Sequence, residues 1–302
     1  MGFFLGIDGG GTNTSCLIGD ENSVLGSGSA GPTNVVRVGE QIASESLEAA
    51  IRQACAVAKV VPAQIDRTCI GASGAGRPEI STLISSVISR IVGGTVDVVA
   101  DTVIALEAAF GSGPGVIVIA GTGSIAYGRN IKGQTARAGG WGHAISDEGS
   151  GHWIGRAAIS AALNAYDEQQ QPPLLNRIMQ SWKLDTFGEL VVRANASPTP
   201  DFAALAPVVR AAADSGDSLA RDVLNQTGTR LAALCKIVIR RLFSDAGAVP
   251  VAMSGGVFRN SPLVCQVFYN NVRSEYPDAI VNLGVIDPVR GALELARKSA
   301  AH

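Results

Sequence analysis

Cysteine and histidine are sparse in this sequence, and neither is spaced as a metal site requires. The five cysteines are scattered and form no C-x-x-C pair: Cys16, Cys55, Cys69, Cys235 and Cys265. The three histidines, at positions 143, 152 and 302, offer no zinc pattern. Zinc sites and iron–sulfur clusters need characteristic ligand spacings, so we expect neither. The cysteines are typical of small core residues in a reducing cytosol.

A strong charge of one sign and a long apolar run are also missing. The net charge is −2, which gives no reason to expect nucleic acid or an anionic membrane as a partner. No uninterrupted apolar run approaches the roughly 20 residues of a membrane span, and the N-terminus lacks the basic segment of a signal peptide. We therefore expect a cytoplasmic protein. With 302 residues, 46% of them hydrophobic, the chain is long enough for two domains.

Two common phosphate-binding motifs are absent as well. A Walker A loop contains Gly-Lys-Ser/Thr, but none of the five lysines follows a glycine. A dinucleotide-binding fingerprint needs a third glycine and an immediate helix. Here Thr14 occupies the third-glycine position, and β-like sequence follows it. Any nucleotide site must therefore be of another kind.

Residues 3–19 do carry a pattern that suits phosphate. We expect residues 3–8 to form a buried strand that ends at Asp8, and residues 15–19 to form the returning strand. The turn between them contains Gly9, Gly10, Gly11 and Thr12, so backbone N–H groups can approach an anion without a Cβ in the way. Asp8 stands where a hydrated Mg²⁺ could be held. The alternative is a plain glycine-rich hairpin turn.

A second, fainter copy of this pattern follows later in the chain. Residues 115–120 are expected to form a buried strand, Gly121-Thr122-Gly123-Ser124 its turn, and residues 125–128 the returning strand. The two turns are about 110 positions apart. Such self-similarity predicts two homologous domains, each of which lends one hairpin to the same polyphosphate.

The order of predicted elements supports two domains of βββαβαβ order, that is, an α/β fold with two ribonuclease-H-like domains around an interdomain cleft. In the first domain, residues 1–110, we expect strands at 3–8, 15–19, 23–28, 67–72 and 95–100, and helices at 39–59 and 78–91. In the second domain, residues 111–287, we expect three strands within 115–138, strands at 250–253 and 279–283, and helices at 151–166, 217–243 and 259–276, with an all-helical insertion at about 169–216. Asp287 and Pro288 begin a C-terminal helix, residues 288–302, that is expected to join the first domain.

Three motifs together resemble those of the N-acetylglucosamine kinase family. They are Asp8-Gly9-Gly10-Gly11-Thr12, Gly121-Thr122-Gly123-Ser124, and the run from Gly140-Trp141-Gly142-His143 to Asp147-Glu148-Gly149-Ser150. That family lies within the BadF/BadG/BcrA/BcrD ATPase-like group of the actin, hexokinase and heat-shock-chaperone superfamily. The third motif is the most specific, because phosphate turns are shared across the superfamily.

The resemblance implies a cleft that holds Mg-ATP and a sugar, and it also implies a homodimer. The positions implied for ATP are Asp8, Gly10, Gly11, Thr12, Gly121, Thr122, Gly123, Ala212, Gly255 and Gly256, with Asp8 holding Mg²⁺ through water. At Ala212 the family has a glycine, so the sequence departs from the pattern there. The positions implied for the sugar are Asn34, Asp101, Ser124, Ile125, Gly140, Trp141, Gly142 and Asp147. Asp101 also matches the catalytic base.

Each of the more specific assignments has a structural alternative. Asp101 has the residue type and position of an N-cap for a helix over residues 102–110. Trp141 has a core aromatic as its alternative, although sugars commonly pack on an aromatic body. For Asp147 the alternative is a solvated loop charge. His143 is expected to be structural rather than catalytic.

The expected reaction is phosphoryl transfer from Mg-ATP to the 6-hydroxyl of an amino sugar, with Asp101 accepting the hydroxyl proton. N-acetylglucosamine is the first candidate acceptor, and glucosamine and N-acetylmuramate remain alternatives. A different class is the dehydratase-activator ATPase, which carries an iron–sulfur cluster. It is disfavoured because no cysteine lies between Cys69 and Cys235. A sugar-sensing regulator with an inactive kinase site is disfavoured because Asp8, Asp101 and both turns are intact.

Overall fold

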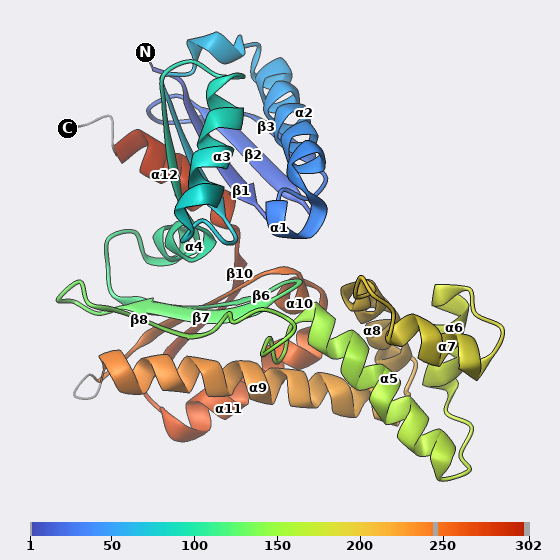
Figure 1. The fold of residues 1–302 in the computed structure, drawn as a ribbon. Helices are drawn as coiled ribbons and strands as arrows, with labels where there is room; N and C mark the ends of the chain where they lie inside the picture. The colour runs from blue at the N-terminus through green and yellow to red at the C-terminus, as the bar shows by residue number, and fades with distance from the viewer. Residues whose placement is uncertain (1, 244–246, 299–302) are drawn as a thin grey trace. The chain divides into compact units, whose positions relative to one another are not determined.

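The computed structural model describes residues 2–243 and 247–298 (Figure 1). The chain divides into two compact units, residues 1–117 with 286–302 and residues 118–285. Each unit contains a five-stranded sheet covered by helices, which confirms the predicted α/β class. The predicted cleft and the predicted domain boundaries stay predictions. In the described part of the chain, no helix combines the length and the apolar character needed to span a membrane.

The sheet of the first unit has the order β3-β2-β1-β4-β5. Its strands are β1 (Phe4–Gly9), β2 (Thr14–Gly19), β3 (Val24–Ala30), β4 (Arg67–Ala72) and β5 (Thr95–Ala100). β2 is antiparallel to β1 and β3, whereas β1, β4 and β5 run parallel. Gly9 pairs with Ala72, and Ala72 pairs with Ala100. The segments after β1, β4 and β5 therefore leave the sheet at one edge.

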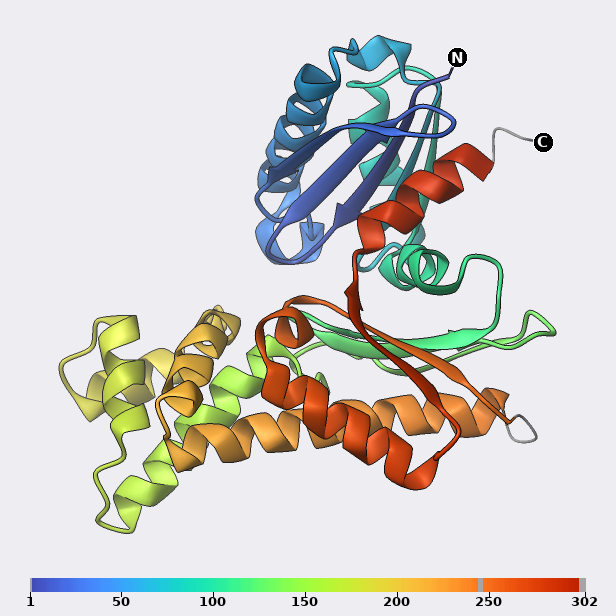
Figure 2. The same cartoon turned by 180° about the vertical axis from the view of Figure 1, so that it is seen from behind.

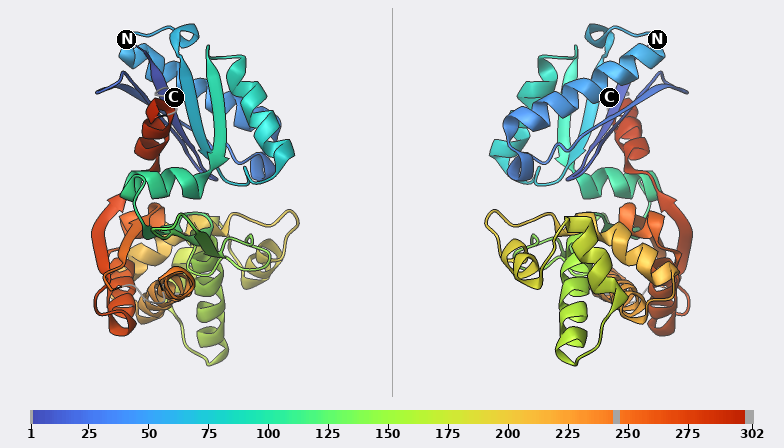
Figure 3. Two further views of the ribbon diagram at one scale, coloured as in Figure 1. Left: turned by 90° about the vertical axis from the view of Figure 1, so that its left-hand side faces the viewer. Right: turned by 90° about the vertical axis from the view of Figure 1, so that its right-hand side faces the viewer.

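Helices cover both faces of this sheet (Figures 2 and 3). They are α1 (Val35–Val38), α2 (Glu40–Ala58), α3 (Pro78–Ser89), α4 (Asp101–Phe110), α12 (Pro288–Lys298) and the short 3₁₀ turn Pro62–Gln64. Side chains alternate across the strands, so Leu5 and Ile7 pack into the core under α2 and α3, whereas Phe4 packs into the core under α4 and α12. The period-2 pattern of the first strand thus forms two separate apolar layers.

Close packing of α12 requires two glycines. A Cβ added at Gly6 would lie 2.3 Å from the Leu293 nitrogen, and one at Gly291 would lie 2.0 Å from the Ile104 oxygen. These approaches are shorter than real Cβ contacts, so α12 can lie against β1 and α4 because neither position carries a side chain. The C-terminal helix thereby packs on the sheet that carries the first glycine turn.

The sheet of the second unit has the order β10-β9-β6-β7-β8. Its strands are β6 (Gly115–Ala120), β7 (Ser124–Arg129), β8 (Thr135–Gly139), β9 (Pro250–Ser254) and β10 (Ile280–Ile286). Its helices are α5 (Gly151–Asp167), α6 (Pro173–Trp182), α7 (Phe187–Ala194), α8 (Ala206–Asp214), α9 (Ser218–Leu242), α10 (Gly256–Asn260), α11 (Pro262–Glu275) and the 3₁₀ turn Phe202–Leu205. The long helix α9 lies against β7 and β8 and also packs against α11 (Figure 1). The all-helical insertion is observed where the sequence predicts it.

The structure differs from the predicted elements at two places. The single helix expected over residues 259–276 is divided into α10 and α11 by Ser261, which is extended (φ −130°, ψ 94°). Ser261 precedes Pro262, and a residue before proline is pushed out of the helical region. The second difference is α1, a one-turn helix over residues for which no element was predicted.

Candidate active site

The first glycine turn joins β1 to β2 and has a fixed backbone. The Gly10 N–H donates to the Asn13 oxygen at 3.0 Å, and the Thr33 N–H donates to the Gly10 oxygen at 3.1 Å. A Cβ at Gly10 would lie 2.8 Å from the Asn13 oxygen, so the turn needs glycine there. Thr12 is exposed at its tip, and Asp8 lies half-buried near the end of β1. The structure thus brings the predicted phosphate-side residues of this unit together.

Asn34 lies beside this turn and has a capping role. It is the N-cap of α1, and its side-chain oxygen accepts from the Arg37 N–H at 3.3 Å. Arg37 in turn donates from Nη1 to the Gly11 oxygen at 2.8 Å. Sequence reasoning missed Arg37. In the sequence Arg37 is only a basic residue three positions after Asn34. Its contact with Gly11 depends on how the chain returns after β3, which the local sequence does not reveal.

Asp101 lies at the same edge of the sheet as the first glycine turn. Gly9, Ala72 and Ala100 are in register across three parallel strands, and neighbouring strands are about 4.8 Å apart. The ends of β1 and β5 are therefore roughly 10 Å apart. Asp101 follows Ala100 directly and is the first residue of α4. This geometry places the Asp101 carboxylate at the sheet edge from which the glycine turn also begins.

The alternative role of Asp101, N-cap of the following helix, is wrong in detail. The N-cap is Ala100, and the Asp101 Oδ1 atom accepts from the Thr102 N–H at 2.8 Å. Burial raises the pKa of the Asp101 carboxyl above its ordinary value, and the hydrogen bond from Thr102 opposes part of that rise. A carboxylate with a raised pKa accepts a proton more readily.

The second glycine turn joins β6 to β7 and is held by the start of α5. The Gly121 N–H donates to the Gly123 oxygen at 2.9 Å. The Gly151 N–H donates to the Gly121 oxygen at 2.8 Å, and the His152 N–H donates to the Thr122 oxygen at 3.4 Å. The carbonyl groups of this turn are thus fixed by backbone donors.

Asp147 ties the loop after β8 to this second turn. Its half-buried carboxylate accepts backbone hydrogen bonds from Ser124 and Gly142. A Cβ at Gly123 would lie 3.0 Å from the Asp147 Oδ2 atom. Burial raises the pKa of Asp147, while the two N–H groups and His143 oppose the rise. The alternative of a solvated loop charge is therefore wrong.

The loop around Trp141 depends on glycines with positive φ. Gly140 and Gly142 have φ of +70° and +93°, which side chains rarely adopt. A Cβ at Gly140 would lie 2.6 Å from the Ile125 Cδ1 atom, so the loop approaches β7 closely. Trp141 itself is 60% exposed, which excludes its alternative as a core aromatic.

The segment after β9 completes this end of the second sheet. Gly255 has a φ of +99°, and a Cβ there would lie 2.3 Å from the Ala120 oxygen at the end of β6. Gly256 is the first residue of α10. Gly255 therefore lies next to the end of β6, where the second glycine turn begins at Gly121. A ligand at this end would meet backbone rather than side chains.

Ala212 lies in the helical insertion of the second unit. It lies in α8, its side chain is fully buried, and its oxygen accepts from the Asp217 N–H at 3.0 Å. α8 is linked to α10 through Arg210, whose Nη1 atom donates to the Asn260 oxygen at 3.1 Å. The structure thus brings the helix of Ala212 close to α10 without exposing the Ala212 side chain.

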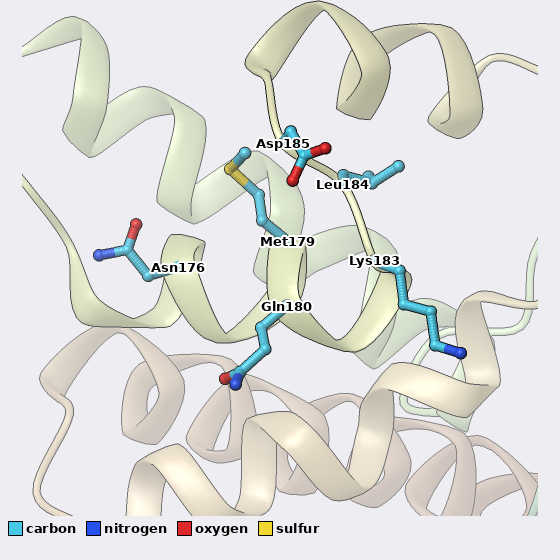
Figure 4. Close-up of a pocket in the computed structure, with 6 residues that line it drawn as sticks. All are labelled: Asn176, Met179, Gln180, Lys183, Leu184 and Asp185. Atoms are coloured by element: carbon cyan, nitrogen blue, oxygen red, sulfur yellow. The ribbon is translucent and has the colours of Figure 1, made fainter.

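A shallow hollow of about 630 Å³ lies elsewhere, on the helical insertion (Figure 4). Its lining comes from α6 and the residues that follow it, namely Asn176, Met179, Gln180, Lys183, Leu184 and Asp185. None of the predicted site residues lines it. The hollow therefore is not part of the predicted site.

The histidines and acids do not form a multi-ligand metal site in the described residues. The His143 and His152 rings lie 4.7 Å apart, and the His152 ring lies 5.0 Å from the Phe202 ring. This aromatic packing supports a structural role for His143. The carboxylate of Asp8 fits Mg²⁺, which commonly keeps several waters and binds through one or two carboxylates plus substrate phosphates.

Comparison with known proteins identifies the family. Residues 5–296 match the BadF/BadG/BcrA/BcrD ATPase family. The chain belongs to this family. It is 33% identical to the N-acetylmuramic acid/N-acetylglucosamine kinase of Clostridium acetobutylicum, over 98% of this chain and 99% of that protein. It is 28% identical to the N-acetyl-D-glucosamine kinase of Dictyostelium discoideum, over 98% of each chain.

Solved structures agree with the fold. A structure described as a candidate N-acetylglucosamine kinase from Chromobacterium violaceum superposes with a TM-score of 0.73 at 26% identity, over 98% of this chain and 99% of that chain. The resemblance inferred from the three sequence motifs is therefore confirmed, as is the predicted two-domain α/β fold class. For this member of the BadF/BadG/BcrA/BcrD family, the roles of the individual site residues remain predictions.

Proposed function

We propose that this protein is an ATP-dependent kinase that phosphorylates the 6-hydroxyl of N-acetylglucosamine. The Clostridium relative is named as a kinase of N-acetylmuramic acid and N-acetylglucosamine, and the Dictyostelium relative as a kinase of N-acetyl-D-glucosamine. Both align over nearly the whole of this chain. These relatives confirm the prediction of an amino-sugar kinase, whereas the acceptor and the hydroxyl that is modified are part of the proposal.

The observation that carries the proposal is the register of the first sheet. Gly9 and Ala100 end two strands that run parallel on either side of β4. The phosphate turn and Asp101 therefore leave one edge of the sheet. The carboxyl ends of parallel strands are where ligands bind in open α/β sheets. A base next to a phosphate turn is what transfer to a hydroxyl requires.

In the proposed reaction, the sugar O6 atom forms a bond to the γ-phosphorus while the bond from that phosphorus to the β,γ-bridging oxygen breaks. ADP leaves with the bridging oxygen, and the proton of the hydroxyl passes to the Asp101 carboxylate. The raised pKa of Asp101 suits that role, because a stronger base draws the proton more readily. Trp141 offers an exposed aromatic surface to the sugar ring, and Asp147 is proposed to bind its hydroxyl groups.

The two glycine turns are proposed to hold the polyphosphate, with backbone N–H groups and the hydroxyls of Thr12 and Thr122 as donors. Asp8 would hold Mg²⁺ through water, and the ion would supply positive charge beside the phosphates. Gly255 and Gly256 would let the adenosine lie on backbone. We further propose that the protein is a homodimer, as the family resemblance implies. We also propose that it is cytoplasmic, because its cysteines are scattered rather than paired.

A panel of sugars in an ADP-release assay tests the proposal. N-acetylglucosamine, glucosamine, N-acetylmuramate and glucose would each be added with ATP and magnesium chloride. We expect N-acetylglucosamine to raise ADP release far above the sugar-free rate, and glucose to do so weakly. If no amino sugar raised the rate, the proposed function would be wrong.

A further inference from the structure

Arg137 lies on the same face of the second sheet as a predicted sugar-binding residue. In the β7–β8 pair, Ile125 is opposite Gly139 and Tyr127 is opposite Arg137. Cross-strand partners share a face, and so do residues two apart along a strand. Ala136 and Ala138 point the other way and are buried. Arg137 is exposed and is therefore a diagonal neighbour of Ile125 on the open face.

The position of Arg137 is fixed from two sides. Its guanidinium carbon lies 4.0 Å from the centroid of the Trp141 ring, a distance typical of a cation–π contact. Its backbone oxygen accepts from the Arg241 Nη1 atom at 2.9 Å. The guanidinium thus rests on the aromatic residue that we propose to bind the sugar, and the strand beneath it is held by α9.

Among residues 2–243 and 247–298, no hydrogen-bond acceptor is assigned to the guanidinium donors of Arg137. A guanidinium that lies on a ring keeps its N–H groups in its own plane, where they can grip a carboxylate in a bidentate manner. In the residues that the structure describes, no carboxylate forms an ion pair with Arg137. The acids of the neighbouring loop are engaged elsewhere, because Asp147 accepts from Ser124 and Gly142, and Glu148 accepts from Ser146 at 2.6 Å.

We infer that Arg137 recognises a carboxylate on the acceptor, so that the enzyme also accepts an acidic amino sugar. This inference rests on the proposed function and names the acceptor class of the same site. An amino sugar with a carboxylate on an ether arm of the pyranose presents a flat anionic group beyond the ring. A pyranose that packs beside Trp141 would bring that group toward the guanidinium that lies over the indole ring. N-acetylmuramate has this chemistry and is the probe.

The test compares two acceptors in wild-type protein and in Arg137 variants. Wild type is expected to phosphorylate both N-acetylglucosamine and N-acetylmuramate. In Arg137→Gln we expect kcat/KM for N-acetylmuramate to fall about 10- to 100-fold, the loss of a charge-assisted pair, and kcat/KM for N-acetylglucosamine to change by less than about 3-fold. Arg137→Lys should restore part of the loss, because it returns the charge without the planar fork.

Lys132→Gln is the matched control, because Lys132 is an exposed cation in the turn of the same hairpin. Removing its charge should leave the ratio of the two kcat/KM values unchanged. Thermal unfolding of each variant shows whether a loss of activity comes from misfolding. If Arg137→Gln is unstable, Arg137→Lys still tests the inference.

The outcomes separate the two proposals. Equal loss with both sugars in Arg137→Gln would mean that Arg137 only supports Trp141, and would overturn the inference. Turnover of N-acetylglucosamine without turnover of N-acetylmuramate would overturn the inference and leave the proposed function intact. No turnover with any amino sugar would overturn the proposed function and the inference together.

Discussion

The two glycine turns share a sequence pattern, yet different groups hold them. In the first turn the Gly10 oxygen accepts from the Thr33 backbone N–H, and the Gly11 oxygen accepts from a side chain, the Arg37 guanidinium. In the second turn the Gly121 and Thr122 oxygens accept from the backbone at the start of α5. The Asp147 carboxylate also lies beside Gly123 in the second turn.

This difference shows how a repeated motif can serve two tasks. The first turn can be loosened by changing one side chain, and the base Asp101 leaves the same sheet edge. The second turn is continuous with the loop of Trp141 and Asp147, so a change there affects the proposed sugar-binding residues. We therefore expect substitutions at Arg37 and Asp101 to alter ATP handling and turnover, and substitutions in the loop of Trp141 and Asp147 to alter sugar binding.

The largest effect is expected for Asp101→Asn. Asn keeps an oxygen that can accept from the Thr102 N–H but cannot take a proton from a hydroxyl. We expect kcat to fall by roughly 10²–10⁴, the usual range for one positioned general base, while KM for ATP stays within about 3-fold. Steady-state ADP release at saturating sugar measures both.

Asp97→Asn is the control for that variant, since Asp97 lies on β5, the strand that directly precedes Asp101, and pairs with Arg67 at 3.0 Å. It should leave kcat unchanged. An Asp101→Asn protein that kept most of its turnover would remove Asp101 from the mechanism.

A smaller effect is expected for Asp147→Ala. Its carboxylate is proposed to bind the sugar and also accepts from Ser124 and Gly142. We expect KM for N-acetylglucosamine to rise about 10- to 100-fold, as for loss of hydrogen bonds to a charged group, with a much smaller rise in KM for ATP. Asp185→Ala, at an exposed carboxylate of the helical insertion, should change neither constant. Equal rises in both constants would show that Asp147 acts by supporting the second turn.

Arg37→Gln tests the support of the first turn and should have a moderate effect. Loss of the 2.8 Å contact with the Gly11 oxygen should raise KM for ATP by about 3- to 10-fold, because the hydrogen bond involves a charged but exposed donor. KM for the sugar should change less. Arg52→Gln, which removes an exposed guanidinium that pairs with Glu48 on α2, is the control. A larger rise in KM for sugar than for ATP would contradict the division between the turns.

The smallest effect concerns stability and pH. The pKa of Asp101 is raised in the folded protein, so over the window between its ordinary and folded values the folded state binds more protons than the unfolded chain. Stability from this group therefore falls as pH rises through that window. Asp101→Asn removes the ionisation, so its Tm relative to wild type should be higher at about pH 8 than at about pH 4. A Tm of Asp101→Asn relative to wild type that stayed constant or fell between about pH 4 and about pH 8 would contradict the assignment.

Much of the fold could be predicted from local patterns. Buried strands with period-2 side chains and helices that begin at Pro78 or Pro288 follow from short-range rules, and the structure places them within a few residues of the predictions. The split at Ser261 was also within reach, because Pro262 restricts the residue before it. It was missed because the apolar spacing on both sides is helical.

The candidate site was only partly predictable. Glycine turns are visible in the sequence because their backbone conformation requires glycine. Strand-end acids are visible because they directly follow apolar strand sequences. Arg37 and Arg137 are not, since their contacts with Gly11 and Trp141 depend on register and on the path of distant loops. The burial of Ala212 is likewise a result of how α8 packs, which residue type alone does not determine.

The most direct test of the account is the identity of the product formed from N-acetylglucosamine and ATP. Phosphorus NMR and ADP quantification on one reaction mixture give both the position and the stoichiometry of transfer. We expect one sugar phosphate for each ADP, with the phosphorus coupled to the two protons on C6. Inorganic phosphate formed in step with ADP, or phosphate on another hydroxyl, would contradict the account.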